Sequence, residues 1–142
     1  MKAETSIVIK RSAEDIWAFF EEEDSQAQWV SGFVEARDRS EGPYGVGSTW
    51  TDVRQQFGRH IESQIEVTEY EPNRKTVYKT TGGPVQAEAT TTFEPVEDGT
   101  RLNYVIEAEA EGYFKLTGPL LNRMIQRQVD SDFSNLKDLL EV

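Results

Sequence analysis

The sequence predicts an α+β fold in which an antiparallel sheet packs against a long C-terminal helix. Over residues 33–111, apolar and polar residues alternate, and five turn signals divide this region into six strands. Over residues 118–141, apolar residues recur at intervals of three or four, which is typical of one helix face. Because a sheet with one solvated face must cover its other face, we expect the helix to supply that cover.

A strand and two short helices are expected before the alternating region. The apolar run within residues 7–10 predicts the first strand, and Ser12 is placed to cap a helix over residues 13–22. Residues 25–31 predict a second short helix that ends at Gly32. The sheet would then contain seven strands, with two short helices between the first strand and the second.

Alternation assigns one face of most strands to the interior. The strand that contains Trp50 gives no clean apolar side, because Thr51 and Val53 share the face opposite Trp50. The orientation of that strand therefore stays open. Three strands have a clear and mainly apolar inward face: Ile61, Ser63, Ile65 and Val67; Ala87, Ala89, Thr91 and Phe93; Leu102, Tyr104, Ile106 and Ala108.

The last helix carries two apolar stripes. The main stripe is suited to lie across the sheet, and it consists of Leu121, Ile125, Val129, Phe133, Leu136 and Leu140. A second stripe of Leu116, Leu120 and Met124 has two interpretations. It is an exposed strip that forms a homodimer contact or a lip over a pocket, or Gly118-Pro119 changes the helix phase and turns it inward.

The chain is strongly acidic. Fifteen Lys and Arg residues against twenty-six Asp and Glu residues give a formal net charge of −11. Nucleic acids and anionic membrane surfaces both require a basic face on the protein that binds them. We therefore expect neither a nucleic-acid partner nor an anionic membrane partner.

The sequence contains no Cys, so it provides no disulfide, no thiolate nucleophile and no zinc-thiolate site. The only apolar run near the N-terminus is residues 7–9, which is shorter than a signal peptide requires. No stretch approaches the roughly 18 to 20 apolar residues of a membrane span. We expect a cytoplasmic protein without stable membrane insertion, organised as one domain over residues 1–142.

Short segments along nearly the whole chain resemble one known group of proteins. They are Ile7 to Ile9, Ser12 to Trp17, Trp29, Gly45 to Trp50, Tyr70-Glu71-Pro72, Thr92 to Pro95, Gly99 to Leu102, and Leu136-Lys137 with Leu140-Glu141. In these segments the chain resembles the polyketide cyclase/dehydrase-like family of the helix-grip superfamily. That superfamily, also called SRPBCC, includes START lipid-transfer domains and the birch pollen allergen.

The resemblance implies a helix-grip fold, in which a seven-stranded antiparallel sheet curves around the long C-terminal helix. It also implies a hydrophobic cavity between sheet and helix that binds a lipid, sterol, polyketide or other apolar small molecule. No cofactor is implied. The matching segments are fold motifs, so they do not identify a reaction.

Inward polar residues and small inward residues indicate where a ligand would lie. A buried hydroxyl must find a partner or cost about 1 to 3 kcal/mol, and a ligand, ordered water or protein group can be that partner. Inward alanines leave space that a packed core would fill. Aromatic residues in this region either line the cavity or belong to the core. The predicted ligand-binding residues are Trp29, Phe33, Trp50, Ser63, Ile65, Tyr78, Ala89, Thr91, Tyr104, Ile106, Leu121, Ile125 and Val129.

Other chemistries lack the residues they need. His60 is the only histidine, and no histidine or carboxylate cluster has metal-ligand spacing, so no metal site is expected. The carboxylate pair of Glu107 and Glu109 lies on the outward face of its strand and is expected to be solvated. The sequence does not identify a catalytic residue.

Three functions are compatible with these features. The first is a cavity protein that binds an apolar or amphipathic small molecule without changing it. The second is an enzyme of the cyclase or dehydratase type that uses the same cavity as a template and moves a proton with a few hydroxyl or carboxyl groups. The third is a protein-interaction module that uses the second helix stripe or the acidic surface.

Overall fold

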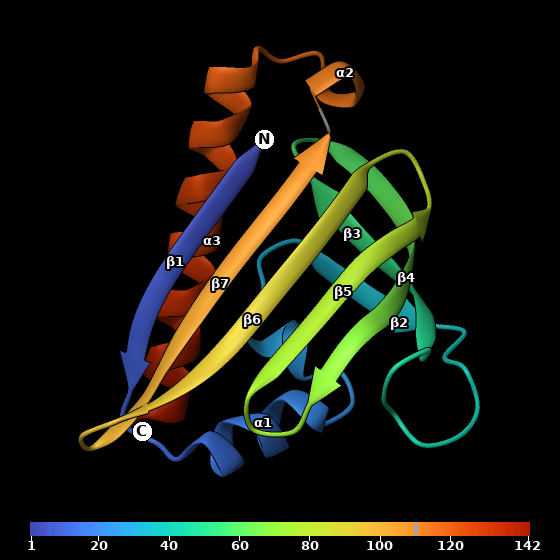
Figure 1. Ribbon diagram of the computed structural model, residues 1–142. Coiled ribbons are helices and arrows are strands. Elements are labelled where there is room, and N and C mark those ends of the chain that lie inside the picture. Colours follow the sequence, from blue (N-terminus) through green and yellow to red (C-terminus); the bar gives the residue numbers. More distant parts are fainter. Residues whose placement is uncertain (110) are drawn as a thin grey trace.

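The computed structural model describes residues 1–109 and 111–142 (Figure 1). Ala110, near the end of the predicted alternating region, lies outside the described residues. The elements follow in this order: β1 (Lys2–Ile9), α1 (Ala13–Glu21), η1 (Ser25–Gln28), β2 (Phe33–Arg37), β3 (Thr49–Gln56), β4 (Arg59–Glu71), β5 (Lys75–Gly82), β6 (Gln86–Val96), β7 (Gly99–Glu109), α2 (Glu111–Phe114) and α3 (Gly118–Leu140).

The sheet confirms the predicted seven strands. They lie in the order β1-β7-β6-β5-β4-β3-β2, and every neighbouring pair is antiparallel. The five predicted turn signals fall between consecutive strands from β2 to β7. Figure 1 shows the sheet curling around α3, with α1 near one end of the sheet and α2 near the other. The predicted architecture, a curved antiparallel sheet with a long C-terminal helix, is therefore confirmed. The sequence did not predict α2.

The N-terminal strand is held by the end of the chain. All eight residues of β1 pair with β7, and the side chains of α3 cover its outer edge. The backbone N–H of Lys2 donates to Asn122 Oδ1 at 2.9 Å. Gln126 Oε1 accepts from the N–H of Glu4 at 3.1 Å, and Gln126 Nε2 donates to the carbonyl of Glu4 at 2.7 Å. The backbone of β1 thus bonds to the backbone of β7 on one side and to side chains of α3 on the other, which leaves less of its edge unpaired.

The helix predicted after Ser12 is confirmed, with its cap. Ser12 Oγ accepts a hydrogen bond from the backbone N–H of Asp15 at 3.1 Å, which satisfies one of the unpaired donors at the helix start. α1 ends at Glu21, at the beginning of the acidic run that follows. Acidic side chains oppose the dipole at a helix C-terminus, so the run favours an early end.

The second short helix is shorter than predicted. It is a 3-10 helix that covers Ser25–Gln28 and does not continue to residue 31. Gly32 instead holds the loop between η1 and β2 against β3, because its carbonyl accepts a hydrogen bond from the N–H of Gln55 at 2.8 Å. A Cβ on Gly32 would lie 2.3 Å from the Gln55 carbonyl oxygen, and the φ of Gly32 is +79°. Close approach of two backbones therefore requires glycine here.

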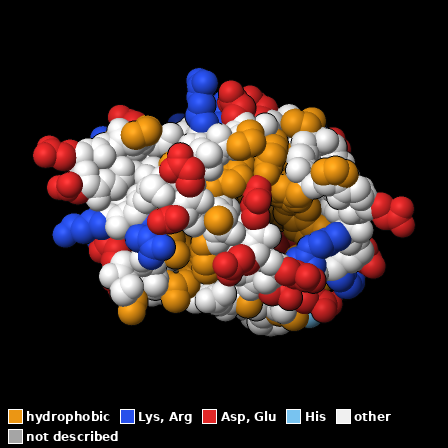
Figure 2. All heavy atoms as spheres, turned by 90° about the horizontal axis from the view of Figure 1, so that it is seen from below, with side chains coloured by type: hydrophobic (Ala, Val, Ile, Leu, Met, Phe, Trp, Pro, Cys, Tyr) orange, Lys and Arg blue, Asp and Glu red, His pale blue; other side chains and the backbone are white. Residues whose placement is uncertain are grey.

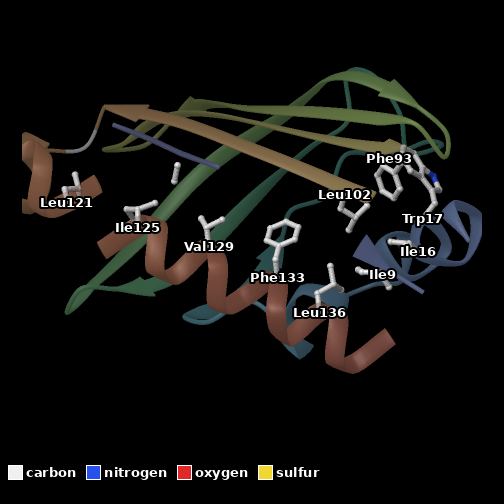
Figure 3. Packing of buried hydrophobic residues seen from close by; sticks show 11 residues of the cluster. Ile9, Ile16, Trp17, Phe93, Leu102, Leu121, Ile125, Val129, Phe133 and Leu136 are labelled. Carbon is white, nitrogen blue, oxygen red and sulfur yellow. The ribbon is translucent and has the colours of Figure 1, made fainter. Parts of the chain in front are cut away.

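The main stripe of α3 packs inward as predicted. Leu121, Ile125, Val129, Phe133 and Leu136 are all buried and point toward the sheet (Figure 3). At the end of the helix near α1, Leu136 belongs to one cluster with fully buried side chains of β1, α1 and β7, namely Ile9, Ile16 and Leu102. The rings of Trp17 and Phe93 extend this cluster, with centroids 5.2 Å apart.

The second stripe does not form one exposed strip. Leu116 precedes α3 and packs against the core cluster, while Leu120 is 43% exposed and Met124 is half-buried. Pro119 lies in the first turn of α3, where its missing N–H costs no helical hydrogen bond. The helix therefore starts after Leu116, and the change of phase at Gly118-Pro119 turns that residue inward.

Charged groups cover the outer surface. On the face seen from below in Figure 2, acidic side chains surround recessed hydrophobic side chains. In the described part of the chain, no helix is both long enough and apolar enough to span a membrane.

Candidate functional site

A cavity of about 270 Å³ lies between the concave face of the sheet and α3. Its walls come from β3 to β7, from the segment around η1 and from the middle of α3. The three inward alanines, Ala87, Ala89 and Ala108, all line it. Small side chains on the strands facing a helix leave a space that larger side chains would fill, which explains why the sheet and helix enclose a cavity at this level.

Most of the predicted ligand-binding residues lie on this wall. Phe33 and Leu121 are not on it: Phe33 begins β2 at the sheet edge, and Leu121 is fully buried in the core cluster. Contact with a ligand stays a prediction for the whole set. The predicted residues that line the cavity are Trp29, Trp50, Ser63, Ile65, Tyr78, Ala89, Thr91, Tyr104, Ile106, Ile125 and Val129.

The structure also orients the strand of Trp50. Trp50 lines the cavity, and Asp52, Arg54 and Gln56 follow it on the same face of β3. The opposite face carries Val53, which is buried as well. The sequence missed these polar positions because an alternating set of charged and amide side chains is the usual pattern of a solvated face. The sequence did contain a signal for them: Asp52, Arg54 and Gln56 follow Trp50 at intervals of two, which places all three on the same face of the strand as Trp50.

An ion pair lies on the cavity wall. Arg54 Nε donates to Asp52 Oδ2 at 2.9 Å, and Arg54 Nη2 donates to Gln26 Oε1 at 3.1 Å. Burial disfavours the charge of Arg54, but the carboxylate of Asp52 outweighs that effect, and the pKa of Arg54 is raised. Arg54 therefore carries its charge into the cavity already paired with a carboxylate.

The helix side of the cavity carries a second carboxylate. Asp132 is 7% exposed, and its Oδ1 accepts from Ser31 Oγ at 2.8 Å and from the Ser31 N–H at 3.1 Å. Gln128 Nε2 donates to Ser31 Oγ at 3.3 Å, and Gln56 Nε2 donates to Gln128 Oε1 at 2.7 Å. This network connects α3, the loop after η1 and β3, so it holds three walls of the cavity together.

Burial raises the pKa of Asp132, although the hydrogen bonds from Ser31 and the charge of Arg54 act in the opposite direction. A raised folded-state pKa contributes stability that is fully present below the unfolded-state pKa and is lost as the pH rises through the folded-state pKa. We therefore expect the difference in unfolding free energy between the wild type and Asp132→Asn to fall as the pH rises above the usual pKa of an aspartate, about 4. Urea unfolding at several pH values measures this difference, and a difference that is constant with pH contradicts the prediction.

Several hydroxyls of the wall have no partner in the described part of the protein. Within residues 1–109 and 111–142, the side chains of Ser63, Thr91 and Tyr104 form no hydrogen bond, although all three line the cavity. The ring of Tyr104 packs on Phe133 with a centroid distance of 4.8 Å. Burial raises the pKa of Tyr104 to about 12, despite the opposing charge of Arg54. Its hydroxyl therefore stays protonated at neutral pH and can donate a hydrogen bond into the cavity.

Aromatic rings form the wall near α1. The ring of Trp29 stacks on that of Phe20, with centroids 5.8 Å apart, and makes an edge contact with the ring of Phe133, with centroids 5.2 Å apart. The sequence left Trp29 open between core and cavity; it packs in this cluster and also lines the cavity. Its indole Nε1 is buried and has no hydrogen-bond partner among the described residues.

The chain's other candidates for chemistry lie outside the cavity. His60 is exposed near the start of β4, and Glu107 and Glu109 are exposed on β7, as the alternation of these strands predicts. Over the described residues, no group of three or more His, Asp or Glu side chains is arranged to hold a metal ion.

Comparison with known proteins identifies one sequence family. Residues 1–141 match a family described as "Polyketide cyclase / dehydrase and lipid transport". No curated protein matches the chain.

Solved structures of distant sequence share the fold. A START superfamily protein from Mycobacterium smegmatis is 15% identical with a TM-score of 0.78, over 99% of this chain and 97% of that chain. The Aha1 dimer from Colwellia psychrerythraea is 23% identical with a TM-score of 0.71, over 100% and 97%. The di-domain ARO/CYC StfQ of the steffimycin biosynthetic pathway is 14% identical with a TM-score of 0.78, over 99% of this chain and 50% of that protein.

Proposed function

The chain belongs to the polyketide cyclase/dehydrase and lipid transport family, and on that premise we propose that its cavity binds an apolar or amphipathic small molecule. One observation carries the proposal. The cavity combines a mainly apolar wall with a few hydroxyls, such as those of Ser63, Thr91 and Tyr104, that have no protein partner among the described residues. A largely apolar pocket with a few converging polar groups is typical of small-molecule sites.

Native mass spectrometry of the purified protein tests this proposal. We expect a small-molecule adduct that disappears when the protein is denatured, and the same molecule should appear in an organic extract of the sample. A titration with hydrophobic probes complements the experiment, because a weakly held ligand is lost during purification. A bare chain that also fails to bind any such probe saturably contradicts the proposal.

Replacing Tyr104 with Phe separates binding from catalysis. The change removes one hydroxyl and little volume, so a binding protein should lose at most about tenfold in affinity, in line with one neutral hydrogen bond. An enzyme that depends on this proton should lose about 100-fold or more in rate with affinity little changed. Calorimetry and a turnover assay with the extracted ligand measure the two effects. The pKa of about 12 favours the first outcome, since a group with such a high pKa transfers its proton poorly at neutral pH.

A second candidate function is a cyclase or dehydratase in the same cavity. The specific observation in its favour is that Asp132, with a raised pKa, shares the wall with Arg54 and Tyr104. Asp132 would take a proton from carbon beside a carbonyl, while Arg54 and Tyr104 would stabilise the resulting enolate oxygen. Mass spectrometry and NMR spectroscopy of the extracted ligand after incubation test this function, because a rearrangement leaves the mass unchanged. Rearrangement or loss of water that depends on the wild-type protein supports it, and an unchanged ligand contradicts it.

A homodimer is a further part of the proposal. The similar Aha1 structure from Colwellia psychrerythraea is a dimer, and Leu120 and Leu139 are exposed apolar side chains on α3 of this chain. Light scattering of the purified protein measures its mass directly. A mass equal to one chain at all concentrations contradicts the dimer without affecting the proposed ligand binding.

A further inference from the structure

The charges inside the cavity do not favour an anion. Three charged side chains lie on its inner wall: one cation, Arg54, and two carboxylates, Asp52 and Asp132. Met1 and Lys79 also line the cavity, but Lys79 is exposed, and the N-terminal ammonium of Met1 donates to the Ala108 carbonyl at 2.8 Å. Both residues also belong to a separate outer groove, which carries Lys2 and three carboxylates that do not line the cavity, namely Glu88, Glu107 and Glu109. The outer groove therefore has balanced charges, and the inner wall has one carboxylate more than it has cations.

The single inner cation is already engaged. Two of the three nitrogens of the Arg54 guanidinium donate to Asp52 and Gln26, at 2.9 and 3.1 Å. An anionic ligand would have to separate Arg54 from Asp52 or lie beside a second carboxylate, Asp132, in a place with little water. Because like charges repel strongly where they are poorly hydrated, both arrangements disfavour an anion.

Donors for an uncharged oxygen remain. Among the described residues, Arg54 Nη1 has no hydrogen-bond partner, and the Tyr104 hydroxyl has none either. Both residues line the cavity. A carbonyl or hydroxyl oxygen can accept from such donors without bringing a charge into the cavity.

We infer that this cavity selects small amphiphiles whose polar group is an uncharged carbonyl or hydroxyl, and that it discriminates against carboxylates. The inference rests on the proposed binding function and specifies its ligand class. The volume limits the ligand too. A cavity of about 150 Å³ holds one benzene molecule, so a cavity of about 270 Å³ accommodates an apolar body of about two fused rings.

Three probes with the same naphthalene body test the inference by calorimetry at neutral pH. 2-Acetylnaphthalene is uncharged, 2-naphthoate is an anion, and 2-naphthylmethylammonium is a cation. For the wild type, we expect the ketone to bind at least about tenfold more tightly than the naphthoate. The cation should also bind more weakly than the ketone, because an ammonium loses hydration while Asp132 is already hydrogen-bonded to Ser31.

The variant Asp52→Asn tests the cause of the selectivity. Removing this carboxylate leaves Arg54 without its ionic partner, so naphthoate affinity should rise by about tenfold, while ketone affinity should stay within about threefold. Glu88→Gln is the matched control. It makes the same change in net charge on the exposed outer face of β6, so it should leave both affinities within about twofold.

The outcomes are distinct. If naphthoate binds the wild type as tightly as the ketone does, the inference is wrong. It is also wrong if the cation binds most tightly of the three probes. In both cases the proposed ligand-binding function remains supported. Failure of all three probes to bind overturns the proposed function with the inference. An equal gain in naphthoate affinity for Asp52→Asn and Glu88→Gln assigns the effect to net charge and overturns the role of the ion pair. The wild-type ranking decides the selectivity even if Asp52→Asn does not fold.

Discussion

Replacing Ala89 with Trp is expected to abolish ligand binding. Ala89 lies on β6 between Tyr78 of β5 and Ile106 of β7, and all three residues line the cavity. An indole at this position points into a space of only about 270 Å³ and occupies much of the volume that a ligand needs. We expect at least about a 100-fold loss of affinity for 2-acetylnaphthalene, measured by calorimetry.

The neighbouring residue provides the control for that experiment. Glu88 is exposed on the outer face of the same strand, so Glu88→Trp adds the same side chain without filling the cavity and should keep affinity within about threefold. Circular dichroism shows whether Ala89→Trp folds, and Ala89→Val and Ala89→Leu provide smaller steps. Affinity that does not decrease along this series in folded protein means that the ligand binds elsewhere.

Replacing Leu136 with Ala is expected to produce the largest loss of stability. Leu136 is 0% exposed and belongs to the cluster in which β1, α1, β7 and α3 meet. Removing a fully buried leucine side chain costs the transfer free energy and leaves a cavity, for a total of about 2 to 5 kcal/mol. Urea unfolding followed by circular dichroism measures the change.

Leu139 allows a matched comparison on the same helix. It is 37% exposed, so Leu139→Ala should lower the unfolding free energy by less than about 1 kcal/mol. Equal losses in the two variants would show that the end of α3 does not pack as described. A Leu136→Ala variant with normal stability would contradict the core cluster itself.

The sheet, α1 and α3 could be predicted because each of them has a local pattern that agrees with its tertiary place. The stripe that begins at Leu121 has helical spacing and also faces the sheet, and Ser12 both caps α1 and follows a strand. The five turn signals all separate strands. When local preference and burial favour the same structure, the sequence alone is sufficient.

The polar half of the cavity could not be predicted in this way. Alternation places Asp52 and Arg54 on one face, but it does not say whether that face meets solvent or an interior cavity. Their ion pair is within one strand, while Gln26 and the Asp132 network come from segments far along the chain. Only the assembled fold brings these groups together. The limits of η1 were missed for a related reason, because Gly32 serves a contact with Gln55 of β3 rather than the end of a helix.

The pairing of β1 with β7, and the bonds from Asn122 and Gln126 to its backbone, also have a consequence for how the protein is made. Within this domain β1 is synthesised before the other strands, but its partners in β7 and α3 are synthesised after all of the others. Such contacts between distant parts of the chain slow folding. The strands from β2 to β7 each pair with a neighbour in sequence, whereas β1 can complete the sheet only once β7 and α3 are available.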